Sequence, residues 1–464
     1  MDDLLPVDAP RSKTPAHDRA RSRGGAWRFW CSDWVAIVAL IVASLAVVVV
    51  HVPQHSLNSP FDEYVYIDYL HKVPTQFVVR QGEDTGTFAR IYVACHGTRM
   101  VDFLPPDVCA QKKTADNIYP MNGLSSADIY SPVYFASTWA LAQPLVLLGD
   151  VGLVNAGRYV GACWLALAAV FLYLTLRRLK VHRGLAVGLG LLLVGSLPAY
   201  WSNTYISTDA AGLAAGSVLV YLSFQVADSK RRAGLWFILA SMAFTLIKVH
   251  NFSAVALTAL FLVLTASVAA FREPGQTRAR LARGVRDPRL VIGIVAGFAA
   301  LIAQISWMSV RAAISLGPSA NQGVATLITP TALVHEVLKF LPGVIDGAID
   351  PARLGTSAFV IAAIGAWIVV AGVIGAVAVE RTGSRTSLFA ISTLIAVLTA
   401  APALAIATRA SAGFYFDLPV RYGIALIPAL LVCAGTVFTR KTWVAMSLGG
   451  TGAALFLMSL RITG

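Results

Sequence analysis

Long apolar runs separated by short basic clusters constrain the fold of this chain more than any other feature. The first run, WVAIVALIVASLAVVVVHV at 34–52, contains no Asp, Glu, Lys or Arg. About 20 apolar residues in a helix cross the hydrocarbon layer of a bilayer, and similar runs recur to the end of the chain. Only 13% of the residues are charged, against roughly 25% in soluble domains. The sequence therefore predicts an all-α polytopic membrane protein.

The apolar runs predict about eleven transmembrane helices. They cover residues 34–52, 155–176, 185–200, 211–226, 235–247, 252–271, 290–311, 359–379, 388–406, 424–438 and 444–460. The run at 131–150 is interrupted by Pro132 and Pro144. A full crossing there would move the basic cluster RRLKVHR to the outer side. We therefore interpret this run as an interfacial or re-entrant helix, with a full crossing as the alternative.

The basic clusters set the expected orientation. The net charge is +13, but the basic residues gather in short links between apolar runs, which is the positive-inside pattern rather than a nucleic-acid-binding surface. We expect residues 1–33 to form a disordered basic cytoplasmic tail and residues 34–464 a single transmembrane domain. Residues 53–153 are then an extracytoplasmic loop with juxtamembrane helices. The frequent arginine and alanine suggest a bacterial cell membrane.

The five cysteines form no metal-binding motif. Cys95 and Cys109 both lie in the long first loop, where an oxidising compartment would allow a disulfide. Two unpaired thiols are an equal alternative, because spacing alone does not establish disulfide geometry. No cofactor is expected, although Asp62, Glu63 and Asp209 have the chemistry to bind a divalent ion.

The long loop opens with an acidic segment, FDEYVYIDYLHKV from residue 61. Its pattern is that of an amphipathic helix lying on the membrane surface, which would hold Asp62 and Glu63 near a lipid phosphate or a sugar. A carboxylate in that position can act as a general base on a hydroxyl acceptor. Solvated loop acids without a special role are the alternative.

Further polar side chains are expected at the outer ends of the later spans. Lys248 lies between two apolar runs with few residues to spare, so a buried cation there needs a counter-charge. His335, Glu336 and Lys339 have the spacing of the solvated face of an amphipathic helix. For the outer arginines Arg409 and Arg421, anchoring at the membrane interface is the alternative role, and for Arg158 it is capping of a span. The remaining candidates are Asp209, His250 and Tyr422.

The order of these motifs resembles that of the GT-C glycosyltransferases, which take sugar from a polyprenyl-phosphate donor. SPFDEYVYIDYL is similar to the family's acidic motif in the first outer loop, and YSPVYFASTWALAQPLVLLGDVGLVNAGRYVGA to its interfacial helix leading to an arginine, here Arg158. STDAAG and VRYGIALIPAL are most similar to motifs of the DUF2142-type predicted membrane proteins. The chain departs from the pattern with PFDE in place of PPDE, and with DLPV where a glycine usually precedes the Arg-Tyr pair.

The resemblance implies a GT-C-like fold and an inverting glycosyltransferase. Asp62 would be the catalytic base, Glu63 would orient the acceptor or support Asp62, and Asp209 would be a second acid near the site. Independently of the family, a departing lipid phosphate needs cations nearby. The candidates are Arg421, with Tyr422 beside it, then Lys248 and His250, and behind them Arg158 and Arg409.

The expected partners follow from this reading. They are a polyprenyl-phosphate-linked sugar donor, a cell-envelope glycan or glycolipid acceptor, and membrane lipid, without nucleic acid. Two alternatives stay open. A flippase or transporter of lipid-linked sugars would carry charged residues near the middle of its spans. A polymerase or ligase of lipid-linked glycans would use outer-face arginines without an essential carboxylate.

Overall fold

The structure is a computed structural model that describes residues 18–99, 109, 116–272, 284–320 and 326–462. Every regular element in these ranges is a helix, as the apolar runs predict, and only isolated β-bridges occur among them. The chain divides into two compact units, residues 1–39 and 40–464. In the first unit the described residues belong to α1 (Asp18–His51), which continues into the second.

Helix α1 begins inside the stretch for which the sequence predicted a disordered tail. Residues 18–33 are helical, in keeping with the several arginines and alanines of DRARSRGGAWRFW, because both residue types favour helix. Residues 1–17 of the predicted tail lie outside the described residues.

Nine helices among the described residues are long and apolar enough to cross a membrane, and a bent pair, α6 (Arg183–Val194) with α7 (Leu197–Asn203), would make ten. The nine are the Asp33–Gln54 segment with α1, α5 (Leu153–Arg178), α8 (Ala210–Ala227), α10 (Phe252–Arg272), α12 (Pro288–Ala313), α14 (Thr356–Val379), α15 (Arg385–Ala412), α16 (Ile427–Phe438) with the turn before it, and α17 (Thr442–Ser459). Each agrees with a predicted span.

The predicted number of about eleven is higher because of α9 (Arg231–Ile247). Its apolar part, Arg232–Ile247, is a shorter apolar helix, roughly 24 Å long at 1.5 Å per residue, against a hydrocarbon layer of about 30 Å. Helix α9 packs along α8 and α12. The predicted interfacial run forms α4 (Pro132–Gly149), which is not among the candidate spans of the described residues.

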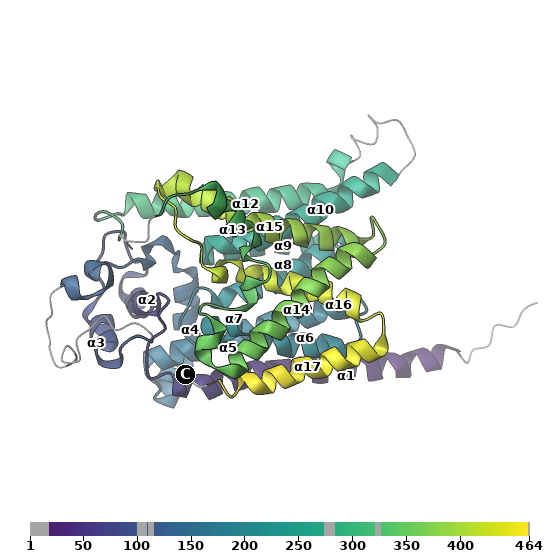
Figure 1. The fold of residues 1–464 in the computed structure, drawn as a ribbon, viewed down its shortest axis with the longest axis horizontal. Helices are drawn as coiled ribbons and strands as arrows, with labels where there is room; N and C mark the ends of the chain where they lie inside the picture. Colours follow the sequence, from purple (N-terminus) through teal and green to yellow (C-terminus); the bar gives the residue numbers. More distant parts are fainter. Residues whose placement is uncertain (1–17, 100–108, 110–115, 273–283, 321–325, 463–464) are drawn as a thin grey trace, which may run out of the picture. The chain divides into compact units, whose positions relative to one another are not determined.

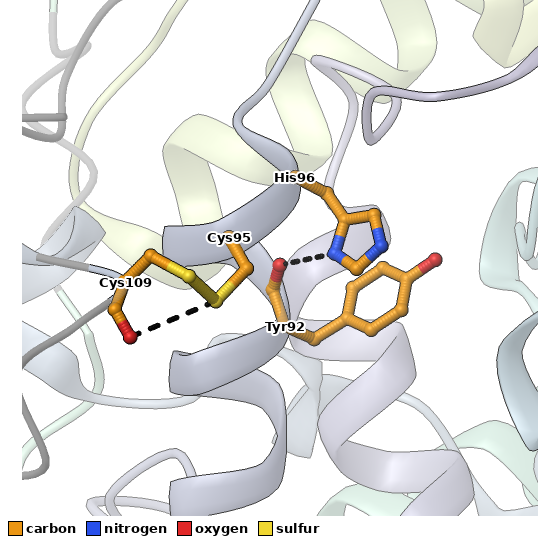
Figure 2. The surroundings of a disulfide bond; sticks show 4 residues. All are labelled: Tyr92, Cys95, His96 and Cys109. Atoms are coloured by element: carbon orange, nitrogen blue, oxygen red, sulfur yellow. Dashed lines mark hydrogen bonds between the residues drawn. A yellow bond between two sulfur atoms is a disulfide. The ribbon is translucent and has the colours of Figure 1, made fainter.

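The first loop folds into α2 (Glu63–Gln76) and α3 (Thr87–His96), which lie with α4 at one end of the long helices of the second unit (Figure 1). Cys95 and Cys109 are joined in a disulfide, so the structure adopts the first of the two alternatives (Figure 2). Asp128, from the end of this loop, accepts hydrogen bonds of 2.8 and 2.5 Å from Arg311 at the end of α12. The loop is therefore attached to the bundle through side chains and not only through its ends.

Charged residues at the two ends of α8 mark the two opposite ends of the bundle. Asp209 is the N-cap of α8 and Asp228 is its C-cap, about 29 Å apart along the helix axis. Asp228 pairs with Arg178 of RRLKVHR and with Arg385 of ERTGSRTS, two basic links that the positive-inside pattern predicts to be cytoplasmic. The predicted outer residues surround Asp209 instead, so the two sets of links lie at opposite ends of the bundle.

Helix α13 (Pro330–Lys339) differs from its prediction. Only His335 of the expected solvated face is exposed, whereas Glu336 is 0% and Lys339 is 8% exposed. Lys339 donates to Glu336, and Glu336 also accepts a 2.6 Å hydrogen bond from the hydroxyl of Tyr415. These contacts turn that face of α13 toward the segment after α15, which is why the solvated-face prediction is wrong for Glu336 and Lys339.

Candidate functional site

Asp62 stands at the start of α2 in an uncommon backbone conformation. It is the N-cap of this helix, and its φ of 63° lies in the left-handed region. That conformation costs a residue other than glycine roughly 1–2 kcal/mol, and such strain tends to collect at functional sites. The side chain is 29% exposed, and its Oδ2 accepts a 3.0 Å hydrogen bond from Nη2 of Arg421.

Arg421 joins the two predicted acids of the site. It lies in the turn Val420–Leu426 before α16, and its Nη1 donates to Oδ2 of Asp209 at 3.1 Å while Nη2 donates to Asp62. The guanidinium carbon also lies 5.0 Å from the centre of the Phe61 ring. The planar fork of arginine can bind two anionic groups at once, and here both are carboxylates of this chain.

Lys248 supplies the second cation, and Asp209 is the counter-charge that its position required. Lys248 Nζ lies 2.5 Å from Asp209 Oδ1, and both side chains are buried. Burial alone would raise the pKa of Asp209, but Lys248 and Arg421 outweigh it and hold that pKa below its usual value. Burial lowers the pKa of Lys248, and Asp209 opposes this effect. Asp209 therefore has two cationic partners.

Aromatic rings enclose this group of charges. The rings of His250 and Tyr422 stack with centres 3.7 Å apart. Lys248 Nζ lies 5.3 Å from the centre of the Tyr422 ring and 5.9 Å from that of Tyr130. We call Asp62, Asp209, Lys248 and Arg421 the charge cluster. The structure thus brings together these four predicted residues with His250 and Tyr422.

Glu63 and Arg158 form a separate, buried ion pair. Arg158 Nε and Nη2 donate to the two carboxylate oxygens of Glu63 at 2.8 and 3.0 Å, and the side chains are 1% and 0% exposed. Glu63 also accepts from the backbone N–H groups of Ser59 at 2.7 Å and Ile206 at 3.0 Å. Glu63 and Arg158 are thus buried partners of each other, and no contact among the described residues joins either of them to the charge cluster.

Arg409 stands apart from the charge cluster. It lies in the last turn of α15, and its guanidinium donates to the carbonyl of Gly413 at the end of the same helix. No contact joins it to the charge cluster among the described residues. Asp68, the third acid of the opening segment, is also structural, because it pairs with Lys72 at 2.8 Å and accepts from Gly86 N–H at 2.6 Å.

A pocket opens beside the charge cluster. Asp209 and Arg421 form part of its lining, and residues that were not named as site candidates form the rest. These are Ser59, Phe61, Pro198, Trp201, Ser202, Ser207, Gly347, Ala348 and Ile424. Four of them lie in motifs quoted from the sequence: Ser59 and Phe61 in SPFDEYVYIDYL, Ser207 in STDAAG and Ile424 in VRYGIALIPAL. The residues from α7 and from the loop at 347–348 had no signal in the sequence. Among the described residues, no group of three or more His, Cys, Asp and Glu is arranged to hold a metal ion.

The candidate site thus consists of a charge-balanced cluster and an adjacent pocket, both at one end of a helical membrane bundle. Two carboxylates face two cations, so the cluster carries no net charge in this state. Asp62 is the most exposed of the four side chains. It contacts a single cation, whereas Asp209 contacts two. An incoming anion would therefore displace Asp62 from Arg421 more easily than Asp209.

No protein-family model and no curated protein matches the chain. Among solved structures, two of the oligosaccharyltransferase of Archaeoglobus fulgidus are similar, one in the apo form with 12% identity and a TM-score of 0.47, the other in complex with zinc and sulfate with 14% and 0.41. The matches cover 93% and 92% of this chain but 56% and 53% of those chains, so this chain spans about half their length. At these values the likeness assigns neither a family nor an activity, and the resemblance to the GT-C glycosyltransferases remains a prediction.

Proposed function

We propose that the protein is an inverting glycosyltransferase that moves a sugar from a polyprenyl-phosphate donor to a hydroxyl of a cell-envelope glycan or glycolipid. The reaction would take place at the charge cluster, on the extracytoplasmic side of a bacterial cell membrane. The observation that carries the proposal is the position of Asp62, a partly exposed carboxylate held 3.0 Å from Arg421 beside a pocket.

In the proposed reaction Asp62 is the general base. The acceptor hydroxyl gives its proton to a carboxylate oxygen of Asp62, and its oxygen forms a bond to the anomeric carbon of the sugar. The bond from that carbon to the phosphate oxygen breaks, and the electron pair leaves with the polyprenyl phosphate. Attack from the side opposite the leaving group inverts the anomeric configuration. Lys248 and Arg421 would stabilise the negative charge that develops on the leaving phosphate.

The resting contacts suggest how the base becomes available. A donor phosphate brings a negative charge into a cluster that is balanced without it, so it competes with the carboxylates for Arg421. Asp209 keeps Lys248 as a partner at 2.5 Å, whereas Asp62 has only Arg421 among the contacts of the described residues. Binding of the donor would thus free Asp62 to accept a proton.

The test is transfer of radiolabelled sugar by purified protein in nanodiscs. Wild type, Asp62→Asn and the control Asp84→Asn are each incubated with polyprenyl-phosphate hexoses and pentoses and with envelope-glycan acceptors. Asparagine tolerates the left-handed conformation better than most residues, so Asp62→Asn removes the base with little strain. Asp84 is an exposed acid of the same loop.

Transfer by wild type and Asp84→Asn that is lost in Asp62→Asn would support the proposal. Equal transfer by Asp62→Asn would exclude Asp62 as the base and favour a polymerase or ligase that uses arginine alone. Binding of the donor lipid by all three proteins without any transfer would favour a flippase or transporter of lipid-linked sugars.

A further inference from the structure

Arg421 lies in a turn whose backbone is contacted on both sides by one short helix, α13, and the residue after it. Leu418, three residues before Arg421, donates its backbone N–H to Oε1 of Glu336 at 3.1 Å. Gly423, two residues after Arg421, lies against the ring of Phe340, the C-cap of α13. Helix α13 therefore reaches the chain just before and just after the arginine of the charge cluster.

The contact before Arg421 gathers several donors on a single carboxylate oxygen. Oε1 of Glu336 accepts a 2.6 Å hydrogen bond from the hydroxyl of Tyr415 as well as the 3.1 Å bond from Leu418. It also accepts from Nζ of Lys339 at 3.1 Å. Glu336 is 0% exposed, and hydrogen bonds to an ionised acceptor are stronger than those between neutral groups. Two of the three donors belong to the segment that leads into Arg421.

The other carboxylate oxygen of Glu336, Oε2, is buried without a partner among the described residues. Such a group costs free energy, and a packed apolar side chain in place of a buried ion pair is often equally stable or more stable. Lys339, the cation beside Glu336, has a second partner in the exposed carboxylate of Asp417. Stability is therefore a weak reason for a glutamate here, whereas its hydrogen bonds to the segment before Arg421 are a specific one.

The contact after Arg421 requires glycine at position 423. A Cβ on Gly423 would lie 2.8 Å from Cγ of Phe340, and a turn of the ring about its own axis would not move that atom away. Phe340 is itself 1% exposed. Between the two positions, the ring of Tyr422 stacks on that of His250. The turn around Arg421 is thus closely packed against its neighbours.

The two ion pairs of Arg421 depend on where this turn lies. Its guanidinium reaches Asp62 at 3.0 Å and Asp209 at 3.1 Å. One planar fork makes both contacts only from a narrow range of positions. Groups that must be held this closely need supporting contacts of their own, and those of the Arg421 backbone come from α13.

We propose that Glu336 is a positioning residue for Arg421. Its carboxylate, together with the ring of Phe340, holds the segment 418–423 where the guanidinium can bind both acids of the charge cluster. Glu336 acts through the backbone of this segment and touches no ligand. Its hold on the segment stands on contacts within this chain, whereas its effect on transfer rests on the proposed function.

The first measurement is hydrogen–deuterium exchange of the purified protein in nanodiscs, which needs neither donor nor acceptor. Glu336→Leu removes the acceptor oxygen. Glu336→Gln removes the charge but keeps an acceptor for Tyr415 and Leu418. The matched control is Glu380→Leu, because Glu380 also pairs with an arginine and accepts from a hydroxyl, but in the link ERTGSRTS at the opposite end of the bundle.

We expect the amides of residues 415–426 to exchange about tenfold faster in Glu336→Leu than in wild type, because two hydrogen bonds of this segment are lost. Exchange in this segment should stay close to wild type in Glu336→Gln and in Glu380→Leu. Tyr415→Phe removes one of the two bonds and should give a smaller acceleration. That variant supplies the readout if Glu336→Leu does not fold.

The second measurement is kcat/KM for sugar transfer, with Glu336→Leu made in wild type and in Arg421→Lys. A displaced Arg421 should lower kcat/KM roughly tenfold or more. Because Glu336 acts through Arg421, the same change should have little further effect in Arg421→Lys, so the two effects do not add. A residue that only stabilises the fold would lower transfer by the same factor in both backgrounds.

The positioning role is overturned if residues 415–426 exchange at the wild-type rate in Glu336→Leu, or if Glu380→Leu accelerates them equally. Exchange in Glu336→Gln as fast as in Glu336→Leu would also overturn it, because the acceptor oxygen would then not hold the segment. Equal losses of kcat/KM with and without Arg421 would do the same.

These outcomes are distinct from a failure of the proposed function. A protein that transfers no sugar, yet shows exchange of residues 415–426 that depends on Glu336, would contradict the glycosyltransferase and keep the hold of Glu336 on the Arg421 segment. A protein that transfers sugar while this exchange is independent of Glu336 would keep the glycosyltransferase and overturn the positioning role.

Discussion

The adjacent acids Asp62 and Glu63 should respond in opposite ways to loss of their charge. Glu63 is 0% exposed and takes part in four hydrogen bonds, two from Arg158 and two from backbone N–H groups. Glu63→Gln would leave Arg158 as a buried cation without its carboxylate, and breaking a buried ion pair in this way costs about 3–5 kcal/mol. Asp62 is 29% exposed with one ion pair, so Asp62→Asn should cost less than about 1 kcal/mol.

The assay is unfolding in a detergent–denaturant titration, followed by transfer measurements on the protein that remains folded. We expect a large loss of stability in Glu63→Gln with transfer per folded molecule preserved to within roughly tenfold, and the reverse for Asp62→Asn. The double variant Glu63→Leu with Arg158→Met should be more stable than either single change, because it leaves no buried charge unpaired.

A stable Glu63→Gln protein that has lost transfer would refute this reasoning. Glu63 would then act on the substrate, as the resemblance to the GT-C glycosyltransferases implied, rather than hold the backbone of α2. A loss of stability in Asp62→Asn as large as that in Glu63→Gln would also refute this reasoning, because Asp62 would then be a structural partner of Arg421.

Three further predictions concern other parts of the site and the loop. In Arg421→Lys the lysine lacks the planar fork that binds two anionic groups at once. We expect kcat/KM for transfer to fall by roughly 10²-fold while the fold stays intact. Unchanged kinetics would contradict the proposed role of Arg421. Burial, reinforced by Arg158, lowers the pKa of His55 to about 2, whereas an unfolded histidine titrates near about 6.5. Below about pH 6.5 the unfolded state binds a proton at His55 that the folded state does not bind. Between about pH 6.5 and 5.5, wild type should therefore lose about 1 kcal/mol of unfolding free energy relative to His55→Gln. Parallel pH profiles of stability for the two proteins would contradict the prediction. Cys95 and Cys109 are 14 residues apart, and a disulfide that closes a loop of that size contributes up to about 3 kcal/mol of stability. Reduction of this disulfide should therefore make the first loop sensitive to protease. Equal protease resistance of the reduced and oxidised protein would contradict the prediction.

The helical part of the fold could be predicted from the sequence because the bilayer imposes it. Apolar runs of a fixed minimum length have one solution in lipid, a helix that satisfies its own backbone hydrogen bonds. The predicted spans accordingly match the structure except at α9, where the apolar helix is shorter than the hydrocarbon layer. The length of the apolar run in α9 can be read from the sequence, whereas the packing of α9 on α8 and α12 cannot.

The charge cluster could be predicted in part for a similar reason. Lys248 sits where a span ends, and a buried lysine requires a carboxylate, which the structure supplies as Asp209. The whole pocket could not be predicted, because Trp201 and Ser202 of α7 and Ala348 of a distant loop are ordinary residues that become neighbours only through tertiary packing. The same limit explains Glu336 and Lys339, whose helical spacing fits a solvated face and a buried face equally well.

The acids of the first loop show where sequence reasoning ends. Asp62, Glu63 and Asp68 lie within seven residues at the start of one helix that the sequence predicts to be amphipathic, and the pattern treats them alike. The prediction of a helix lying on the membrane surface is wrong for the first half of α2, because all its residues from Glu63 to Leu70 are buried in the protein. The difference arises at one backbone torsion, because Asp62 is left-handed at a φ of 63° while Glu63 begins α2. That turn directs Glu63 to Arg158 and Asp62 to Arg421. No side-chain pattern encodes a left-handed aspartate, which costs roughly 1–2 kcal/mol, and the neighbouring Glu63 is held in place by four hydrogen bonds. We therefore predict that Glu63, which the sequence placed second in the catalytic pair, positions Asp62, the first.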